Sequence, residues 1–188
     1  MRPIASGAKL TYDDFLLFPD DGNRHELIDG EHYVTPSPNT RHQAILGNLY
    51  WLLRSYLEQH PIGTAMLAPF DVVFSHVDVV EPDLLYVSKA RWPEIVTSQN
   101  IRGAPDLAVE IGSPSTRQRD RTIKRDVYQR FGVGEYWVID GEIDTVEVYR
   151  RRGDRFDPPG TLSRARGDVV STPLLPGFAL RLADLFRD

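Results

Sequence analysis

Residues 104–140 read APDLAVEIGSPSTRQRDRTIKRDVYQRFGVGEYWVID and are the most informative part of the chain about its fold. Its apolar runs at 106–111 and 135–140 predict two strands, and the residues between them predict a helix. Residues 112–116 break the first strand and offer helix caps, and Gly132 supplies the helix stop. Because a strand-helix-strand crossover joins parallel strands, the sheet must contain at least one parallel pair.

Further predicted elements lie on both sides of this stretch. Upstream, 24–34 holds two extended runs around Asp29-Gly30, the usual sign of a tight hairpin. The clearest helix spans 40–60, where apolar side chains recur at helical spacing after a turn at 36–40. The remaining expected elements are a short capped helix at 11–18, strands at 65–74, 77–87 and 145–151, one helical turn within the loop 88–103, and a short terminal helix after 174–178.

These elements predict a fold of the α/β (α+β) class, with a mixed β-sheet flanked by helices on both faces. At 188 residues, the chain fits one domain that can bury a single core without disulfides. We expect this domain to span 1–188, with an opening hairpin at 24–34, a core at 40–140, and closing strands and a short helix at 141–188.

Charge and composition restrict the classes of function. The chain has 22 Lys and Arg against 27 Asp and Glu, which gives a net charge of −5. A negative charge has the wrong sign for binding the phosphates of duplex DNA over a broad face. Any nucleic-acid contact must therefore be local. The lack of Cys excludes thiolate metal sites, thiol catalysis and disulfides. No apolar run approaches the roughly 20 residues of a membrane span. Residues 1–6 lack a signal-peptide core, so we expect a cytoplasmic protein without membrane contact.

Two acidic residues lie inside apolar runs and are the leading site candidates. Asp83 sits in VVEPDLLYV and Glu110 sits in APDLAVEI, on what we expect to be consecutive strands. A charge in such a run costs several kcal/mol to desolvate unless a cation compensates it, so the pair suggests a shared metal. Oxygen ligands without Cys favour Mg²⁺ or Mn²⁺ over zinc, and such an ion suits phosphodiester hydrolysis. Pro82 indicates a strand end or a bulge beside Asp83. A solvated strand carboxylate is the alternative for Asp83.

Lys124 is the candidate for orienting the attacking water. An ammonium group near a scissile phosphate would also offset the negative charge that develops there. Asp120, Lys124 and Tyr128 fall four apart and share one helix face. The alternative for Lys124 is an i,i+4 salt bridge with Asp120, worth only about 0.3–0.5 kcal/mol. Tyr128 and Tyr136 are more typical of a core or an interface than of catalysis.

Three further features carry two interpretations each. His42 lies on the apolar face of the 40–60 helix, where a hydrogen-bonded core histidine is the usual finding and a metal or general-base role is the less usual one. Glu26 is a candidate metal ligand, but its place in the hairpin favours an exposed carboxylate. The densest basic group is either a phosphate contact or a solvated helix face balanced by Asp120 and Asp126, and it consists of Arg117, Arg119, Arg121 and Arg125.

The motifs together form an ordered series. It consists of ELIDGE at 26–31, PSP at 36–38 with His42-Gln43, EPD at 81–83, PDLAVE at 105–110, SPST at 113–116, Asp120, Lys124, Tyr128 and GVGEYWVID at 132–140. This series resembles the Uma-type family of restriction-endonuclease-like proteins, over residues 10–186. That family is placed in the PD-(D/E)XK nuclease superfamily. The resemblance implies the restriction-endonuclease-like fold, a divalent-metal phosphodiesterase, a homodimer, and a location in the bacterial cytoplasm.

The resemblance also implies roles for single residues. Asp83 matches the superfamily's first acidic metal ligand and Glu110 its second. Two positions after Glu110, where the superfamily motif has lysine, this chain has Gly112. Families of this type often carry that lysine on the following helix, and Lys124 would supply it. Two further family positions border the pocket, and they correspond to Glu26 and His42.

The leading hypothesis is a Mg²⁺- or Mn²⁺-dependent endonuclease that acts on nucleic acid, with DNA as the expected substrate. In it, Asp83 and Glu110 bind the metal, Lys124 orients water, and His42 or Glu26 completes the pocket. A second hypothesis is a nuclease-fold scaffold that binds nucleic acid without turnover, since the motif lysine is absent and the net charge is negative. A third is a dimer that mainly recognises another protein.

Overall fold

The central sheet contains the predicted parallel pair. In the computed structural model, which describes residues 9–35, 37–113 and 116–187, this sheet has seven strands. They are β3 (Gly63–Leu67), β6 (Leu84–Ser88), β8 (Leu107–Gly112), β9 (Glu135–Asp140), β10 (Thr145–Arg152), β11 (Arg155–Phe156) and β12 (Gly160–Ser163). β8 and β9 run parallel, whereas the other paired neighbours in this sheet are antiparallel.

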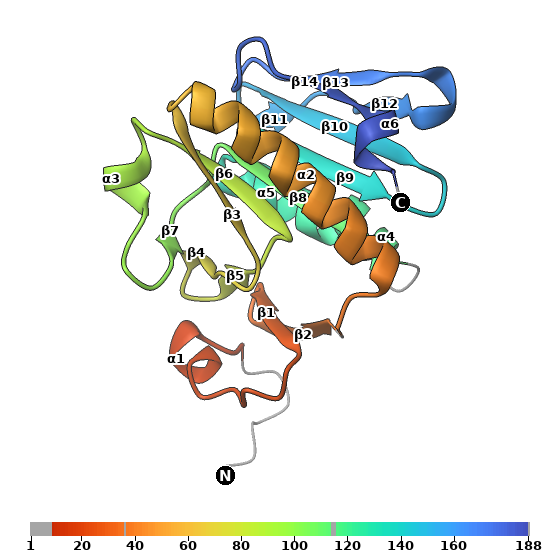
Figure 1. Cartoon of the computed structure of the whole chain (residues 1–188). Helices are drawn as coiled ribbons and strands as arrows, with labels where there is room; N and C mark the ends of the chain where they lie inside the picture. Colours follow the sequence, from red (N-terminus) through yellow and green to blue (C-terminus); the bar gives the residue numbers. More distant parts are fainter. Residues whose placement is uncertain (1–8, 36, 114–115, 188) are drawn as a thin grey trace.

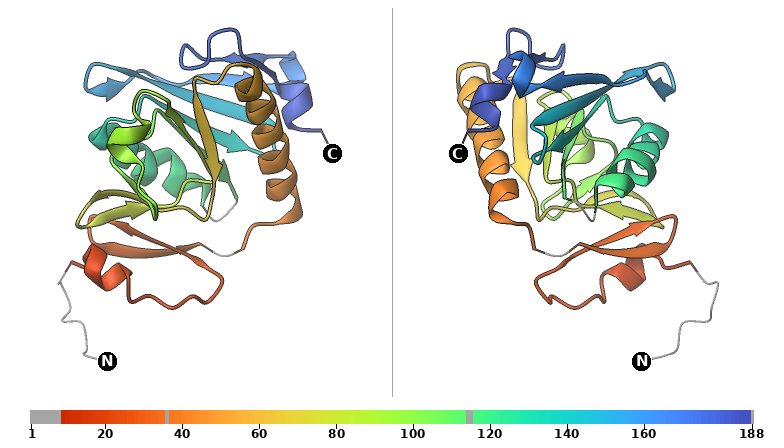
Figure 2. Two further views of the ribbon diagram at one scale, coloured as in Figure 1. Left: turned by 60° about the vertical axis from the view of Figure 1, so that its left-hand side comes forward. Right: turned by 90° about the vertical axis from the view of Figure 1, so that its right-hand side faces the viewer.

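Helices cover both faces of this sheet (Figure 1). α2 (Thr40–Gln59) lies across one face and is capped by the side chain of Asn39. The opposite face is covered by a continuous helical segment that contains α4 (Arg117–Arg119), the π-helical turn η1 (Asp120–Lys124) and α5 (Arg125–Phe131), as Figure 2 shows. This segment is the predicted crossover helix, and it ends at Gly132, where φ is +89°. The expected α/β (α+β) class with a mixed, helix-flanked sheet is confirmed.

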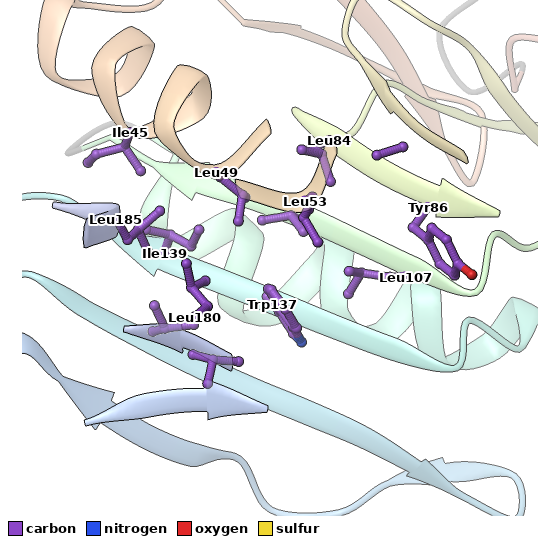
Figure 3. Close-up of a cluster of buried hydrophobic side chains, with 14 of the residues drawn as sticks. Ile45, Leu49, Leu53, Leu84, Tyr86, Leu107, Trp137, Ile139, Leu180 and Leu185 are labelled. Atoms are coloured by element: carbon purple, nitrogen blue, oxygen red, sulfur yellow. The ribbon is translucent and has the colours of Figure 1, made fainter. Parts of the chain in front are cut away.

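The central sheet divides the apolar core into two layers. Along β8, Val109 and Ile111 join the layer under α2, whereas Ala108 joins the layer under α5, as strand alternation requires. Glu110 is two positions from Ala108, so its carboxylate is directed to the α5 side. The α2-side layer, drawn in Figure 3, includes Leu49, Leu53, Trp137 and Ile139.

A smaller sheet carries the predicted hairpin. Its strands are β1 (Arg24–Ile28), β2 (Glu31–Thr35), β4 (Val72–Ser75), β5 (Asp78–Val80) and β7 (Ile101–Arg102), in the order β2-β1-β5-β4-β7. β1 and β2 pair around Asp29 and Gly30, whose φ angles of 51° and 75° are those of a tight hairpin turn. The predicted N-terminal helix, α1 (Tyr12–Phe15), is capped by Thr11 and packs near Leu27.

The prediction of continuous strands at 65–74 and 77–87 is wrong, because each stretch crosses between the two sheets. The first divides into β3 and β4 around Ala68-Pro69, and the second divides into β5 and β6 around Pro82. A proline nitrogen cannot donate a ladder hydrogen bond, so a strand interior does not pass through either position. Pro82 therefore marks a strand end, and Asp83 stands directly before β6.

The remaining elements lie in the connecting and closing regions. α3 (Trp92–Ile95) is the predicted helical turn within 88–103. The closing region adds η2 (Arg164–Arg166), β13 (Val169–Ser171), β14 (Ala179–Arg181) and the expected terminal helix α6 (Leu182–Leu185). Expectations for residues 1–6, Pro36, Pro114 and Ser115 fall outside the described residues. Within the described part of the chain, no helix has the length and apolar character needed to cross a membrane.

Candidate active site

Asp83 and Glu110 meet where β6 begins and β8 ends. The register pairs Leu84 of β6 with Val109 of β8, so one further step places Asp83 opposite Glu110. Opposed side chains in an antiparallel pair lie about 4.5–5.5 Å apart at Cβ. Both carboxylates are almost fully buried, and both line one cavity of about 210 Å³. Lys124 and His42 line the same cavity.

Asp83 is held by a cation, an imidazole and a backbone amide. Its Oδ1 atom lies 2.6 Å from Nη1 of Arg24, and its Oδ2 atom lies 3.1 Å from Nε2 of His42. Oδ2 also accepts a hydrogen bond of 2.7 Å from the backbone N–H of Ile111. Burial raises the pKa of Asp83, but the His42 hydrogen bond and the Arg24 charge outweigh it and bring the pKa to about 2. Asp83 is therefore a carboxylate at neutral pH.

Lys124 is buried between two other carboxylates. Its Nζ atom is paired with Oε1 of Glu110 and lies 2.7 Å from Oε1 of Glu26. Burial lowers the pKa of Lys124, but the charges of Glu110 and Glu26 raise it above its usual value, so the amine stays protonated. Within the part of the chain that the structure describes, Lys124 forms ion pairs with these two residues and not with Asp120, contrary to the simple i,i+4 interpretation.

Glu26 is buried, so the prediction of an exposed hairpin carboxylate is wrong. Only 2% of it is exposed, because β1 lies between β2 and β5 and places this side chain towards the helical segment. Besides Lys124, its Oε1 atom accepts a 2.9 Å hydrogen bond from the N–H of Glu81. Burial raises the pKa of Glu26, and the Lys124 charge overcomes this and leaves the pKa lowered. Glu26 therefore anchors Lys124 rather than lining the cavity itself.

Burial and neighbouring carboxylates together raise the pKa of Glu110. Burial raises this pKa, Lys124 lowers it, and the nearby Asp83, Asp120 and Glu26 raise it again, to about 8. Tyr128 also donates a 2.6 Å hydrogen bond to Oε1 of this carboxyl group. Repulsion of this kind is relieved when a cation binds between the carboxyl groups.

The donor atoms at the site fit a hard divalent cation. Asp83 and Glu110 offer oxygen ligands, and Mg²⁺ is commonly held by one or two carboxylates together with water and substrate oxygens. Among residues 9–35, 37–113 and 116–187, no three carboxylate or imidazole groups could hold an ion by themselves. The residues therefore fit a two-carboxylate site for Mg²⁺ or Mn²⁺ that is completed by water or substrate.

His42 faces the cavity from the first turn of α2. Its backbone N–H donates to the side chain of Asn39 at 2.8 Å, which fixes the start of the helix. Because Nε2 contacts Asp83, the ring is anchored, while the buried Nδ1 atom has no hydrogen-bond partner among the described residues. The ring is thus neither a fully satisfied core histidine nor a solvent-exposed one.

Sequence reasoning did not single out Arg24, which contacts Asp83 directly. Arg24 and Glu26 lie two positions apart on β1 and so share one face of the strand, a spacing that could have indicated a role for Arg24. Arg119 was considered only as part of the basic group. Its Nη2 atom lies 2.6 Å from Oγ1 of Thr35 and 3.8 Å from Oε2 of Glu26, and it lines the cavity.

The other members of the basic group are paired elsewhere. Arg117 and Arg121 both pair with Asp140, while Arg125 pairs with Asp126. The expected balance by Asp126 is therefore present for one arginine, whereas Asp120 forms no ion pair with these arginines in the described structure. Tyr136 donates to the backbone oxygen of Asp120 at 3.0 Å and is a core residue, as its type suggested.

Comparison with known proteins agrees with this fold. The model of a family named Uma2, described as "Putative restriction endonuclease", matches residues 12–183. The chain belongs to the Uma2 family. A solved structure from Anabaena variabilis ATCC 29413, titled as a putative nuclease belonging to DUF820, is 26% identical to this Uma2 protein with a TM-score of 0.79. The alignment covers 94% of this chain and 97% of that chain. A search of curated proteins finds no match. The Uma2 protein thus has the expected restriction-endonuclease-like fold.

Proposed function

We propose that this protein is a divalent-metal-dependent endonuclease that hydrolyses phosphodiester bonds in nucleic acid, with DNA as its substrate. The observation that carries the proposal is the placement of Asp83 opposite Glu110 at a shared cavity, with the protonated amine of Lys124 beside them. Two carboxylates and an ammonium group at one point provide the charges that phosphodiester hydrolysis requires.

Asp83 and Glu110 are the residues that would hold Mg²⁺ or Mn²⁺. A bound ion of this kind supplies an activated water and offsets charge on the phosphate. Asp83 is ready for this role, because its pKa of about 2 keeps it ionised. Burial and the nearby carboxylates raise the pKa of Glu110, so a metal would compete with a proton for this group.

Lys124 would act on the attacking water and on the charge that develops at the phosphate. Gly112 stands where the superfamily motif has lysine, so β8 offers no amine of its own. Lys124 reaches the same carboxylate from η1, and Glu26 fixes its position from β1. His42 anchors Asp83 through Nε2 and leaves Nδ1 available to accept a proton or a hydrogen bond at the cavity.

A cleavage assay with matched variants tests this function. Purified protein is incubated with plasmid DNA, single-stranded DNA or RNA in the presence of Mg²⁺ or Mn²⁺. We expect metal-dependent cleavage of DNA that is lost in Asp83→Asn and Glu110→Gln. Asp106→Asn is the matched control, because this carboxylate caps the N–H of Ser88 away from the cavity. Equal cleavage by the unaltered protein and Asp83→Asn would end the proposal.

A second candidate function is a nucleic-acid-binding scaffold without turnover. It is favoured by the observation that both carboxylates already have cationic partners, Arg24 for Asp83 and Lys124 for Glu110. This candidate predicts DNA binding with no cleavage under any metal. A binding constant that does not change with salt would count against it, because phosphate contacts release counterions.

We further propose that the protein assembles as a homodimer, as the family resemblance implies. Light scattering coupled to size-exclusion chromatography measures the molar mass directly. A mass of one chain across the working concentration range would contradict the dimer.

A further inference from the structure

Arg24 lies between two cavities. It lines the cavity of about 210 Å³ that contains Asp83 and Glu110, and it also lines a neighbouring cavity of about 380 Å³. His42 and Asp83 are shared between the two cavities as well. The side chain of Arg24 is 21% exposed, whereas that of Asp83 is 3% exposed. The side chain of Arg24 therefore keeps partial access to solvent, while its carboxylate partner is almost fully buried.

Each of the other cations at the cavity has a partner besides the two proposed metal ligands. Lys124 is buried between Glu26 and Glu110 and keeps Glu26 if Glu110 turns to a metal. Arg41 pairs with Asp144 at 2.7 Å. Arg119 contacts Thr35 at 2.6 Å and lies over an aromatic ring of β2.

Arg24 differs from these cations because, among the described residues, its one ion-paired carboxylate is a proposed metal ligand. Its Nη1 atom lies 2.6 Å from Oδ1 of Asp83, and its other acceptor among the described residues is the carbonyl oxygen of Glu81, at 3.4 Å. A divalent cation on Asp83 would compete for the carboxylate and repel the guanidinium group. A partly buried guanidinium that loses its carboxylate needs another anion within reach, and a phosphate suits its forked donors.

We propose that Arg24 binds the substrate phosphate after exchanging its partner. Without metal, it neutralises Asp83. When metal occupies Asp83, Arg24 turns to a phosphate group of the nucleic acid at the same cavity. This inference rests on the proposed function, because it takes Asp83 as a metal ligand. Metal and phosphodiester then promote each other's binding, and by linkage this coupling is reciprocal.

Binding measurements with Arg24 variants test the exchange without relying on turnover. Mn²⁺ binding to the free protein is measured by titration calorimetry. Binding of a short phosphorothioate oligodeoxynucleotide is measured by fluorescence anisotropy, with and without Mn²⁺. Arg24→Gln removes the charge, whereas Arg24→Lys keeps the charge and removes the fork. Arg91→Gln is the matched control, because Arg91 pairs with Asp106 and does not line either cavity.

Arg24→Gln should bind Mn²⁺ roughly tenfold more tightly than the unaltered protein, because the ion no longer breaks a charge-assisted pair. The same variant should lose the gain in oligonucleotide affinity that Mn²⁺ produces in the unaltered protein. Arg24→Lys should keep the weaker Mn²⁺ affinity and lose part of that gain. Arg91→Gln should behave as the unaltered protein.

An Arg24→Gln protein with unchanged thermal melting and unchanged or weaker Mn²⁺ affinity overturns the inference. If Arg24→Gln does not fold, Arg24→Lys is used to test the inference. An Arg24→Lys protein that binds the oligonucleotide in Mn²⁺ as tightly as the unaltered protein overturns the inference. Metal-coupled binding that depends on Arg24, without cleavage of ordinary DNA, supports the inference and ends the nuclease proposal. If the unaltered protein cleaves DNA and Arg24→Gln has the affinities of the unaltered protein, the nuclease proposal is supported and the inference about Arg24 is overturned. Absence of Mn²⁺ binding by the unaltered protein overturns both.

Discussion

At the scale of single residues, two neighbouring carboxyl groups have opposite acidities. Both are buried, but Asp83 has a hydrogen bond from His42 and the charge of Arg24, which bring its pKa to about 2. For Glu110, burial and three nearby carboxylates outweigh Lys124 and raise the pKa to about 8. Environments that separate two carboxyl pKa values in this way are typical of acid–base sites.

The pKa of Glu110 predicts how metal affinity depends on pH. A metal must displace its proton below pH 8, so Mg²⁺ affinity should rise by up to about tenfold per pH unit between pH 6 and 8 and then level off. Calorimetry in buffers of different ionisation enthalpy should detect close to one proton released at pH 7. Equal affinities at pH 6.5 and 8.5 would contradict this prediction.

The raised pKa of Glu110 also predicts how the stability of the metal-free protein changes with pH. Folded Glu110 keeps a proton that the unfolded chain loses near its ordinary pKa of 4.5. The contribution of Glu110 to the free energy of unfolding is therefore fully present below pH 4.5 and is lost as the pH rises through about 8. In Glu110→Gln, urea unfolding should lack this loss between pH 5 and 8.

The helical segment after β8 carries Lys124, the amine that we propose in place of the motif lysine that β8 lacks. Lys124 belongs to the π-helical turn η1, in which the N–H of Arg125 donates to the carbonyl oxygen of Asp120. Such turns often occur at functional sites. This turn presents Asp120 and Lys124 as buried charges facing the sheet.

Moving the lysine from η1 to β8 tests whether Lys124 takes the place of the motif lysine. Lys124→Ala should lower the cleavage rate by about a hundredfold or more, as loss of a charge-stabilising donor does. Adding Gly112→Lys should restore part of the rate, because a Cβ at this position meets its nearest atoms at 3.6 Å, an ordinary contact. Gly112→Ala in the same background is the control and should restore nothing. A Lys124→Ala protein that cleaves at the unaltered rate would rule out this role.

The long helix α2 packs on the face of the central sheet opposite α5. Removing one of its buried side chains should therefore lower stability by a measurable amount. Leu53 is fully buried against the central sheet (Figure 3). Leu53→Ala should lower the free energy of unfolding by about 2–5 kcal/mol, through lost apolar contact and the cavity left behind. Leu16, which is 61% exposed, gives the control, and Leu16→Ala should change stability by less than about 0.5 kcal/mol. Chemical denaturation measures both, and equal effects would contradict the assignment of this layer as the core.

Across the chain as a whole, the negative net charge limits how the proposed nucleic-acid substrate can bind. With a net charge of −5, attraction for phosphates must come from the few cations at the cavity. The plot of log binding constant against log salt should therefore have a shallow slope of about −2 to −3, as two or three phosphate contacts give. Anisotropy titrations over a range of salt concentrations measure it. A slope steeper than about −6 would require a broad basic surface.

The sequence indicated most elements and both strand carboxylates, because apolar periodicity and turn residues act locally. The crossover from β8 to β9, the hairpin and α2 all follow from such local patterns. Local patterns did not show that the stretches 65–74 and 77–87 each contain two strands. The two halves of each stretch are both apolar, and they differ in the sheet to which they belong. Glu26 was misjudged for a similar reason, since its burial depends on a helix almost one hundred residues further along the chain.

Local sequence patterns predicted the fold class, the parallel pair and the expectation that Asp83 and Glu110 act together. The folded chain was needed to see that Lys124 joins Glu110 to Glu26, that Arg24 contacts Asp83, and that the two sheets separate at prolines. Hydrophobic spacing and backbone propensity are properties of neighbouring residues. The partner of a buried charge is instead set by long-range packing, which brings β1, β8 and η1 to one cavity.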